Sequence, residues 1–302
     1  AGIIYCSDPT KLQRARKNEV EINGAHAAHN RDAIAIIRFL QWLDETTPVT
    51  RLTELDVVSK IFAFRAEGDL FKGLSFPTIA GAGPNGAIVH YVPTKQSNRK
   101  LEQGTLLLLD SGGQYLDGTT DITRTVPIGI PDKEMRRHFT LVLKGHIAIA
   151  SAHFPVGTNG GQLDALARQY LWRADLNYNH GTGHGVGSYL GVHEGPHRLA
   201  SGSQVPFEAG MIISNEPGQY LQDQYGIRIE NLLVVVESQA EGFLEFAPLT
   251  LVPIDRRLID IDQLSNQEQN WLNGYHQNVY SNAADKLDEK TLAWLTTMCA
   301  PI

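Results

Sequence analysis

The sequence predicts an α+β domain in which a mostly antiparallel sheet is covered by helices. Helical and hairpin patterns alternate along the chain in the order helices, hairpin, helices, hairpin, and each hairpin carries an acidic pair, Asp110 with Asp121 in the first and Glu216 with Glu230 in the second. The chain of 302 residues, 42% hydrophobic and 20% charged, also has the size and composition of a globular protein. The halves share this plan without a sequence repeat, so we expect one domain whose halves meet at a shared site.

The first half is expected to open with a long helix over residues 10–45. Apolar side chains recur on one face of this segment, and Pro48 ends it. Thr53 then has the position of an N-cap, because Asp56 follows three residues later and would lie near the first amides of a new helix. Two helices therefore precede the first hairpin.

The stretch 76–93 is expected to form a loop, a turn and a short strand. A run of four leucines then ends on Asp110, and a glycine-rich segment reverses the chain near residues 117–118. The second strand of this hairpin runs out through Arg124, so that Asp121 returns beside Asp110. The first hairpin thus delivers two carboxylates to one place.

The second half repeats the plan, with a glycine-rich segment at 180–196 that is unsuited to a regular helix. Two strands joined by a polar turn follow it, and the chain closes with helices that pack through Trp271, Leu272 and Trp294. The expected helices are 132–153, 160–174 and, at the C-terminus, 265–297; the expected strands lie within 208–220, 225–237 and 248–255.

Composition excludes several classes of protein. The formal charge of −7 and the lack of a basic run argue against a nucleic-acid partner. Two cysteines, Cys6 and Cys299, exclude a disulfide framework and a thiolate zinc site and suit a reducing compartment. No apolar run approaches the roughly 18 residues that span a bilayer. The start lacks a signal-peptide layout and an initiator Met, so we expect a cytoplasmic protein and a fragment of a longer chain.

Four acids stand at strand ends or inside strands where burial is expected, and an isolated buried carboxylate is costly. Each could pair with Arg124 or Arg228, which is the simplest explanation for any one of them. Four acids need more positive charge than two arginines supply, so metal ions explain the set better. The acids are Asp110, Asp121, Glu216 and Glu230.

Adding one neutral histidine, His184, gives a site with four negative charges that two divalent cations balance. Mostly oxygen ligands with one imidazole favour Mn²⁺, although Co²⁺, Zn²⁺ or Fe²⁺ also fit. Two such ions generate hydroxide at neutral pH and polarise a carbonyl. His180 and His184 have the i, i+4 spacing of a zinc helix, but the glycines around them and the missing glutamate of HExxH exclude that motif.

Four segments together resemble the pita-bread metallopeptidases, a family that includes methionine aminopeptidase, prolidase and Xaa-Pro aminopeptidase. They are LLDSGGQYLDGTTDITRT, HGTGHGVGSYLGVHEGP, SNEPGQY and YGIRIENLLVV. The stretch LSFPTIAGAGPNGAIVHY and the tail from PLTLVPID onward are similar to the long, cytosolic-type Xaa-Pro aminopeptidases. Gln219 departs from the family, in which an aromatic residue is expected after Glu-Pro-Gly.

The resemblance implies the pita-bread (creatinase/aminopeptidase) fold, with pseudo-symmetric halves and a curved sheet, around two divalent metal ions. Asp110 and Asp121 would bind one ion. Asp121 and Glu230 would each reach toward both. His184 and Glu216 would complete the coordination of the other.

The resemblance also implies catalytic and substrate-binding roles. Glu216 would serve as general base. His90 and His193 would hold the substrate and stabilise the tetrahedral intermediate, and His180 would belong to the substrate pocket. Arg228 would lie against the carboxylates and orient them.

By the same resemblance, the activity would be hydrolysis of the first bond of peptides with proline in second position, in a homodimer without nucleic-acid or membrane partners. Prolidase, methionine aminopeptidase and a non-enzymatic binding module of the same fold remain alternatives. Residues 1–250 would be the catalytic domain and 251–302 a helical extension packed on it. By this resemblance, we expect the N-terminal domains of the long family members to be absent from the sequence given.

Overall fold

The computed structural model describes residues 8–302, and Cys6 lies outside that range. Its helices are α1 (Lys11–Ala15), α2 (Glu19–Thr46), α3 (Glu54–Ala66), α4 (Lys133–Ala150), α5 (Gly160–Trp172), α6 (Asn266–Ala283) and α7 (Glu289–Met298). Its strands are β1 (Phe71–Leu74), β2 (Ile79–Ala82), β3 (Thr105–Ser111), β4 (Gly113–Tyr115), β5 (Gly118–Thr119), β6 (Ile122–Ile128), β7 (His153–Pro155), β8 (Gly183–His184), β9 (Arg198–Leu199), β10 (Ile212–Asn215), β11 (Gly218–Leu221), β12 (Tyr225–Arg228), β13 (Asn231–Glu237) and β14 (Phe243–Pro248).

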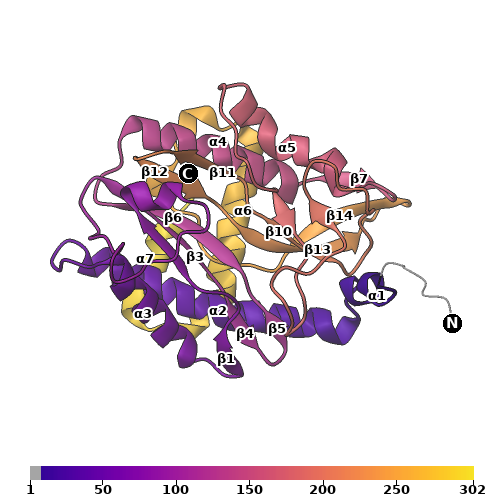
Figure 1. The fold of residues 1–302 in the computed structure, drawn as a ribbon, viewed down its shortest axis with the longest axis horizontal. Coiled ribbons are helices and arrows are strands. Elements are labelled where there is room, and N and C mark those ends of the chain that lie inside the picture. The colour runs from indigo at the N-terminus through magenta and orange to yellow at the C-terminus, as the bar shows by residue number, and fades with distance from the viewer. Residues whose placement is uncertain (1–7) are drawn as a thin grey trace.

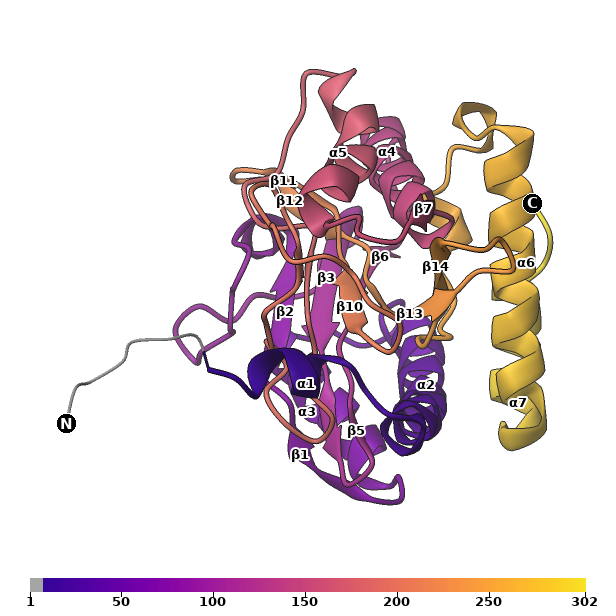
Figure 2. The same cartoon turned by 90° about the vertical axis from the view of Figure 1, so that its right-hand side faces the viewer.

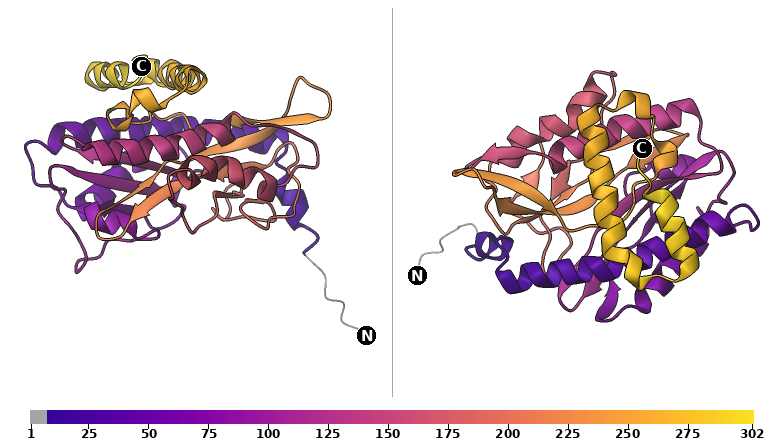
Figure 3. Two further views of the ribbon diagram at one scale, coloured as in Figure 1. Left: turned by 90° about the horizontal axis from the view of Figure 1, so that it is seen from above. Right: turned by 180° about the vertical axis from the view of Figure 1, so that it is seen from behind.

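Antiparallel sheets form the centre of the molecule, which confirms the expected α+β class (Figure 1). Two of them have the strand orders β2-β3-β6 in the first half and β10-β13-β14-β7 in the second. Helices α2 and α4 cover one side of the strands (Figure 2). The C-terminal helices α6 and α7 form an outer layer over α2 and α4 (Figure 3).

The leucine strand β3 is buried on both faces, which explains its unbroken apolar run. Leu107 and Leu109 pack in the cluster beneath α2 and α3, whereas Leu106 packs with residues of α4 and the C-terminal helices. Strand β3 pairs with β6 along its whole length, and Asp110 lies opposite Thr123. Asp110 therefore ends a strand whose position is fixed from both sides.

The expected helix over 10–45 is wrong in one respect, because the chain breaks at Arg16–Asn18 into α1 and α2. Asn18 caps α2: its side chain accepts from the Glu21 amide, and the Glu21 side chain accepts from the Asn18 amide. The Lys17 amide donates to the Gly210 carbonyl at 3.0 Å instead of continuing a helix. This reciprocal arrangement is a capping box. The capping box expected for Thr53 with Asp56 is confirmed at the start of α3.

The strand expected within 76–93 forms before the turn rather than after it. It is β2, which pairs with β3. The following loop is held by the fully buried carboxylate of Glu54, which accepts hydrogen bonds from the Ala82 amide, the Asn85 side chain and the Tyr91 hydroxyl. This loop holds His90 without strand pairing, so no alternation of apolar and polar residues marks its position in the sequence.

The strand expected at 248–255 is also wrong, because β14 ends at Pro248. Beyond it, the Arg124 guanidinium donates to the carbonyls of Val252 and Pro253. A side chain from the first half thus satisfies backbone carbonyls that a strand would have paired. Proline also lacks the N–H that would donate a hydrogen bond to a neighbouring strand.

The remaining elements of the second half follow the prediction. Helices α4 and α5 begin after the N-caps Asp132 and Asn159. Each long strand expected after residue 208 is divided at its carboxylate: Glu216 separates β10 from β11, and Glu230 separates β12 from β13. No helix of residues 8–302 is both long and apolar enough to cross a membrane.

A buried ion pair fixes the end of β3 near the first acid. The Arg65 Nε atom lies 2.7 Å from Asp32 Oδ1, and the Tyr115 hydroxyl donates to the same oxygen at 2.8 Å. Arg65 also donates to the Ser111 carbonyl, one residue after Asp110. Burial alone would raise the Asp32 pKa, but the charge and hydrogen bonds of Arg65 and the Tyr115 bond outweigh it and lower that pKa.

We expect Asp32→Asn to lower the free energy of unfolding by about 3–5 kcal/mol near pH 7, because Arg65 is left buried without its counter-charge. An acid with a lowered folded pKa contributes stability above its unfolded pKa and loses it as pH falls through the folded value. The difference between the two proteins should therefore shrink below about pH 4. Urea unfolding at several pH values measures it, with the exposed Asp69→Asn as control. A difference independent of pH would contradict this account.

Candidate active site

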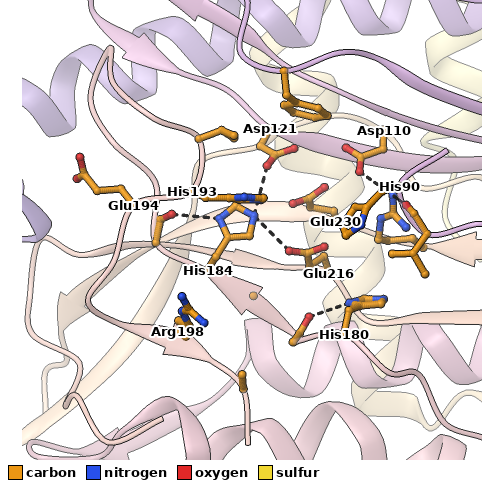
Figure 4. Close-up of a pocket in the computed structure, with 18 of the residues that line it drawn as sticks. His90, Asp110, Asp121, His180, His184, His193, Glu194, Arg198, Glu216 and Glu230 are labelled. Atoms are coloured by element: carbon orange, nitrogen blue, oxygen red, sulfur yellow. Dashed lines mark hydrogen bonds and ion pairs between the residues drawn. The ribbon is translucent and has the colours of Figure 1, made fainter. Parts of the chain in front are cut away.

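A cavity of about 610 Å³ opens between the two halves, and all nine residues predicted for the site line it (Figure 4). They are His90, Asp110, Asp121, His180, His184, His193, Glu216, Arg228 and Glu230. Their positions span 140 residues of sequence from His90 to Glu230 (230 − 90 = 140). The fold therefore brings together the whole set that the sequence proposed.

The carboxylates enter the cavity from strand ends. Asp110 is near the end of β3 and Asp121 immediately precedes β6, while Glu216 follows β10 and Glu230 precedes β13. Strand β8 contributes His184, and the Ser214 hydroxyl accepts from its amide at 2.9 Å. Rigid strand pairs on both sides thus fix the side chains that meet here.

The geometry of His184 fits a metal ligand. Its Nδ1 lies 3.0 Å from the Gly185 carbonyl, which only accepts, so Nδ1 bears the proton and Nε2 keeps its lone pair. Nε2 lies 3.6 Å from Asp121 Oδ2 and 3.3 Å from Glu216 Oε1. Burial lowers the His184 pKa, which favours this neutral ring. A lone pair facing two carboxylate oxygens is repulsive unless a cation lies between them.

The carboxylates keep oxygens free for a cation. Ligand atoms of Asp121, His184 and Glu230 all lie within 4.8 Å of one another. Among residues 8–302, Asp110 Oδ1, Asp121 Oδ1 and Glu230 Oε1 are buried without a hydrogen-bond partner. Such orphaned acceptors are uncommon in folded proteins, and here they face a shared space (Figure 4). The residues present therefore fit a cation centre.

Electrostatics supports the same conclusion. Burial raises the Asp121 pKa well above its usual value, and the negative charges of Glu230, Asp110 and Glu216 add to the effect. The Glu230 pKa is raised well above its usual value by burial, then by Glu216 and Asp110. Burial also raises the pKa of Glu216 to about 8 against the opposing charge of Arg228. These acids stay ionised together only when nearby cations offset their charges.

Pairing with arginine accounts for only one of the four acids. Arg228 Nη2 lies 2.6 Å from Asp110 Oδ2. Arg124 donates instead to carbonyl, amide and hydroxyl oxygens, including the Glu230 carbonyl at 2.6 Å. One buried guanidinium against three buried carboxyls and the partly buried Glu216 leaves a negative site.

The predicted histidines surround this cluster. The ring centroids of His184 and His193 are 4.2 Å apart in an edge-on arrangement. The His180 Nε2 atom lies 2.8 Å from the Tyr220 hydroxyl, and burial lowers the His180 pKa to about 4, so its ring is neutral near pH 7. His90 lies on the cavity wall (Figure 4), and the carbonyl of the preceding Val89 accepts a hydrogen bond from Arg228 at 3.4 Å.

Sequence reasoning missed three side chains that support the acids. Tyr220 accepts a 2.6 Å hydrogen bond from Arg228, Thr123 donates to Glu230 Oε2 at 2.8 Å, and Ser214 donates to Glu216 Oε1 at 3.0 Å. Alternation along strands could have found two of them, because Thr123 and Ser214 are each two residues from an acid and so share its face. Tyr220 also lies next to Gln219, where the family pattern expects an aromatic residue.

Comparisons with known sequences find similarity to metallopeptidases. A model described as metallopeptidase family M24 matches residues 23–237, and a model of the C-terminal region of peptidase M24 matches 242–302. A probable Xaa-Pro aminopeptidase P of Laccaria bicolor is 45% identical, over 96% of this chain and 47% of that protein. Aminopeptidase P1 of Arabidopsis thaliana is 41% identical, over 99% of this chain and 51% of that protein. The chain spans about half the length of these relatives.

Solved structures give the same picture. A crystal structure of X-prolyl aminopeptidase from Caenorhabditis elegans, described as a cytosolic enzyme with a di-nuclear active site, superposes with a TM-score of 0.94 at 43% identity. The match covers 98% of this chain and 50% of that one. The Xaa-Pro dipeptidase from Bacillus anthracis gives a TM-score of 0.71 at 27% identity, over 82% of this chain and 64% of that one.

Proposed function

This chain belongs to metallopeptidase family M24, and on that premise we propose that it is the catalytic part of an aminopeptidase that hydrolyses the first bond of peptides with proline in second position. The observation that carries the proposal is the convergence of three buried carboxyls, the partly buried Glu216 and the His184 lone pair on one cavity. Residues 1–250 would form the catalytic domain and 251–302 a helical extension on it, a division supported by the separate matches to 23–237 and 242–302.

Two divalent ions are proposed for the site. Their ligands would be Asp110, Asp121, His184, Glu216 and Glu230. Mn²⁺ is the metal we favour, since four of the five ligands are carboxylates and one is an imidazole. When bound, two such ions make a water acidic and polarise a peptide carbonyl. Arg228, held by its bonds to Asp110 and Tyr220, would keep the carboxylates oriented.

The chain's own residues then account for the remaining steps. Glu216, whose other contacts are the Ser214 hydroxyl and the His184 ring, would take a proton from the attacking water. His90 and His193 on the cavity wall would hold the substrate and donate to the oxyanion that develops on its carbonyl. Glu216 would return the proton to the leaving proline nitrogen, which departs as a secondary amine.

Hydrolysis of an Xaa-Pro-Xaa peptide tests this function. The 302-residue chain should cleave Ala-Pro-Ala between its first two residues, lose that activity on chelation and regain it when Mn²⁺ is added. The bound metal ions are the only proposed means of making the attacking water acidic, so removing them should lower the rate by several orders of magnitude. Cleavage that persists through chelation would contradict the proposal.

A substrate panel separates the alternatives. A prolidase would cut only the Xaa-Pro dipeptide, a methionine aminopeptidase would prefer Met-Ala- peptides, and a binding module would purify without stoichiometric metal. The structural likeness to the C. elegans X-prolyl aminopeptidase supports the proposed Xaa-Pro aminopeptidase activity over these alternatives. Its TM-score is 0.94, against 0.71 for the B. anthracis dipeptidase. A cytoplasmic location and a homodimer complete the proposal. The location has the support of the cytosolic C. elegans relative.

A further inference from the structure

A buried ion pair joins the segment before α2 to the wall of the candidate active site. Lys17 Nζ lies 2.7 Å from Glu194 Oε1, and the two side chains are 1% and 9% exposed. Lys17 Nζ also donates to the Arg14 carbonyl at 2.7 Å. Glu194 directly follows His193, so this pair fixes the residue next to a proposed substrate-binding group (Figure 4).

The lysine is itself held in place by its backbone. The Lys17 amide donates to the Gly210 carbonyl, and Arg16 forms an isolated antiparallel bridge with Met211. Gly210 has a φ of +88°, and a Cβ there would come within 2.6 Å of the Lys17 carbonyl. The break between α1 and α2 therefore places Lys17 at a fixed point of the second half.

The loop on the other side of the pair, which contains Glu194, forms no helix or named strand over residues 186–195. Residues 185–195 include glycines at 185, 187, 191 and 195, which makes the loop costly to order. Backbone bonds from the Glu194 amide to the Gly185 carbonyl and from Gly187 to Gly191 close it. Outside the loop, Gln114 and Thr119 bond the Leu190 carbonyl at its tip, whereas Lys17 holds its base beside His193.

We propose that Lys17 is a positioning residue that acts through Glu194 to fix His193 against His184 and the cavity. This inference rests on the proposed function for its consequence in catalysis. Lys17 lies upstream of residues 23–237, which the family model matches, so the model gives it no role. Breaking a buried ion pair leaves an uncompensated charge, and the Glu194 carboxylate would then turn toward water and move the loop.

Kinetics on single and double variants test the positioning role. Lys17→Met should lower kcat/KM for Ala-Pro-Ala at least about tenfold, since misplacing a reacting or binding group by about 1 Å costs up to about 10²-fold. In a His193→Ala background the same change should alter kcat/KM by less than about twofold, because its target is gone. Equal losses in both backgrounds would overturn the inference. Arg16→Met is the matched control, since Arg16 is adjacent to Lys17 in the sequence but forms an exposed ion pair with Glu208.

Amide exchange tests the inference without any catalysis. In Lys17→Met, amides of residues 185–194 should exchange at least about tenfold faster than in wild type or in Arg16→Met. Unchanged exchange would overturn the positioning role, whereas a wild-type chain that cleaves no Xaa-Pro peptide would overturn the proposed function instead. Should Lys17→Met fail to fold, Glu194→Gln against Glu208→Gln gives the same comparison. Glu194→Gln keeps an acceptor for Lys17 and should lose less activity than Glu194→Ala.

Discussion

Glu216→Gln is expected to lower kcat for Ala-Pro-Ala by at least about 10³-fold, in the range that loss of a general base produces. Glutamine retains the shape of the side chain and an oxygen near Ser214 and His184, but it cannot accept a proton at neutral pH. Glu216 lies in the cavity with one oxygen near the Ser214 hydroxyl and the His184 ring, where its carboxylate can accept a proton from the attacking water. Steady-state kinetics at saturating Mn²⁺ measure the effect.

The control for this variant is Glu245→Gln, which removes an exposed carboxylate of β14 far from the cavity and should leave kcat unchanged. Metal content must be measured beside the kinetics, because Glu216 is also a proposed ligand. Near-normal, metal-dependent hydrolysis by Glu216→Gln would reject the role of general base.

Asp121→Asn is expected to abolish hydrolysis and to reduce bound metal below two ions per chain. Asp121 has unfavourable surroundings for a charge: it is buried, one of its oxygens has no partner among residues 8–302, and it faces three other carboxyls. An amide removes a charge from that group and weakens its attraction for cations. Elemental analysis after dialysis against Mn²⁺ measures the change.

The same substitution should stabilise the chelated protein. Without cations, removing one buried negative charge relieves repulsion from Glu230, Asp110 and Glu216, and should raise the free energy of unfolding by on the order of 1 kcal/mol. Added Mn²⁺ should then raise the melting temperature of wild type much more than that of Asp121→Asn, because a ligand that binds only the folded state stabilises it. Asp117→Asn, which alters a half-exposed acid paired with Arg31, is the control. If the chelated Asp121→Asn protein were less stable than chelated wild type, the proposed repulsion between Asp121 and the other acids of the site would be contradicted.

The acids were predictable because each interrupts a local pattern. Asp110 ends a run of leucines and Glu230 interrupts an apolar strand, and both sites are costly for a charge. The order of the ligand residues then identified the pita-bread family, which the family match and the solved structures confirm. Local periodicity thus predicted the class of fold and the cost of burial pointed to the four acids, whereas the roles proposed for the histidines came from the resemblance to the family.

The features that sequence reasoning missed depend on contacts between distant segments. The loop with His90 has no strand pairing because Glu54, 36 residues earlier (90 − 54 = 36), accepts its hydrogen bonds. The expected strand at 248–255 is absent because Arg124 takes the carbonyls that the strand would have used. The pair of Lys17 with Glu194 is 177 residues apart in sequence. No window of sequence contains both partners of such contacts, so propensity and spacing could not reveal them.

A crystal of this chain soaked in Mn²⁺ and measured near the manganese absorption edge gives the most direct test of the electrostatic account. Anomalous maps should show two peaks about 3.5–4 Å apart, bounded by the four acids and His184, as expected for a pair of ions that share carboxylates. An empty cavity, or one peak bound outside those five side chains, would contradict the account.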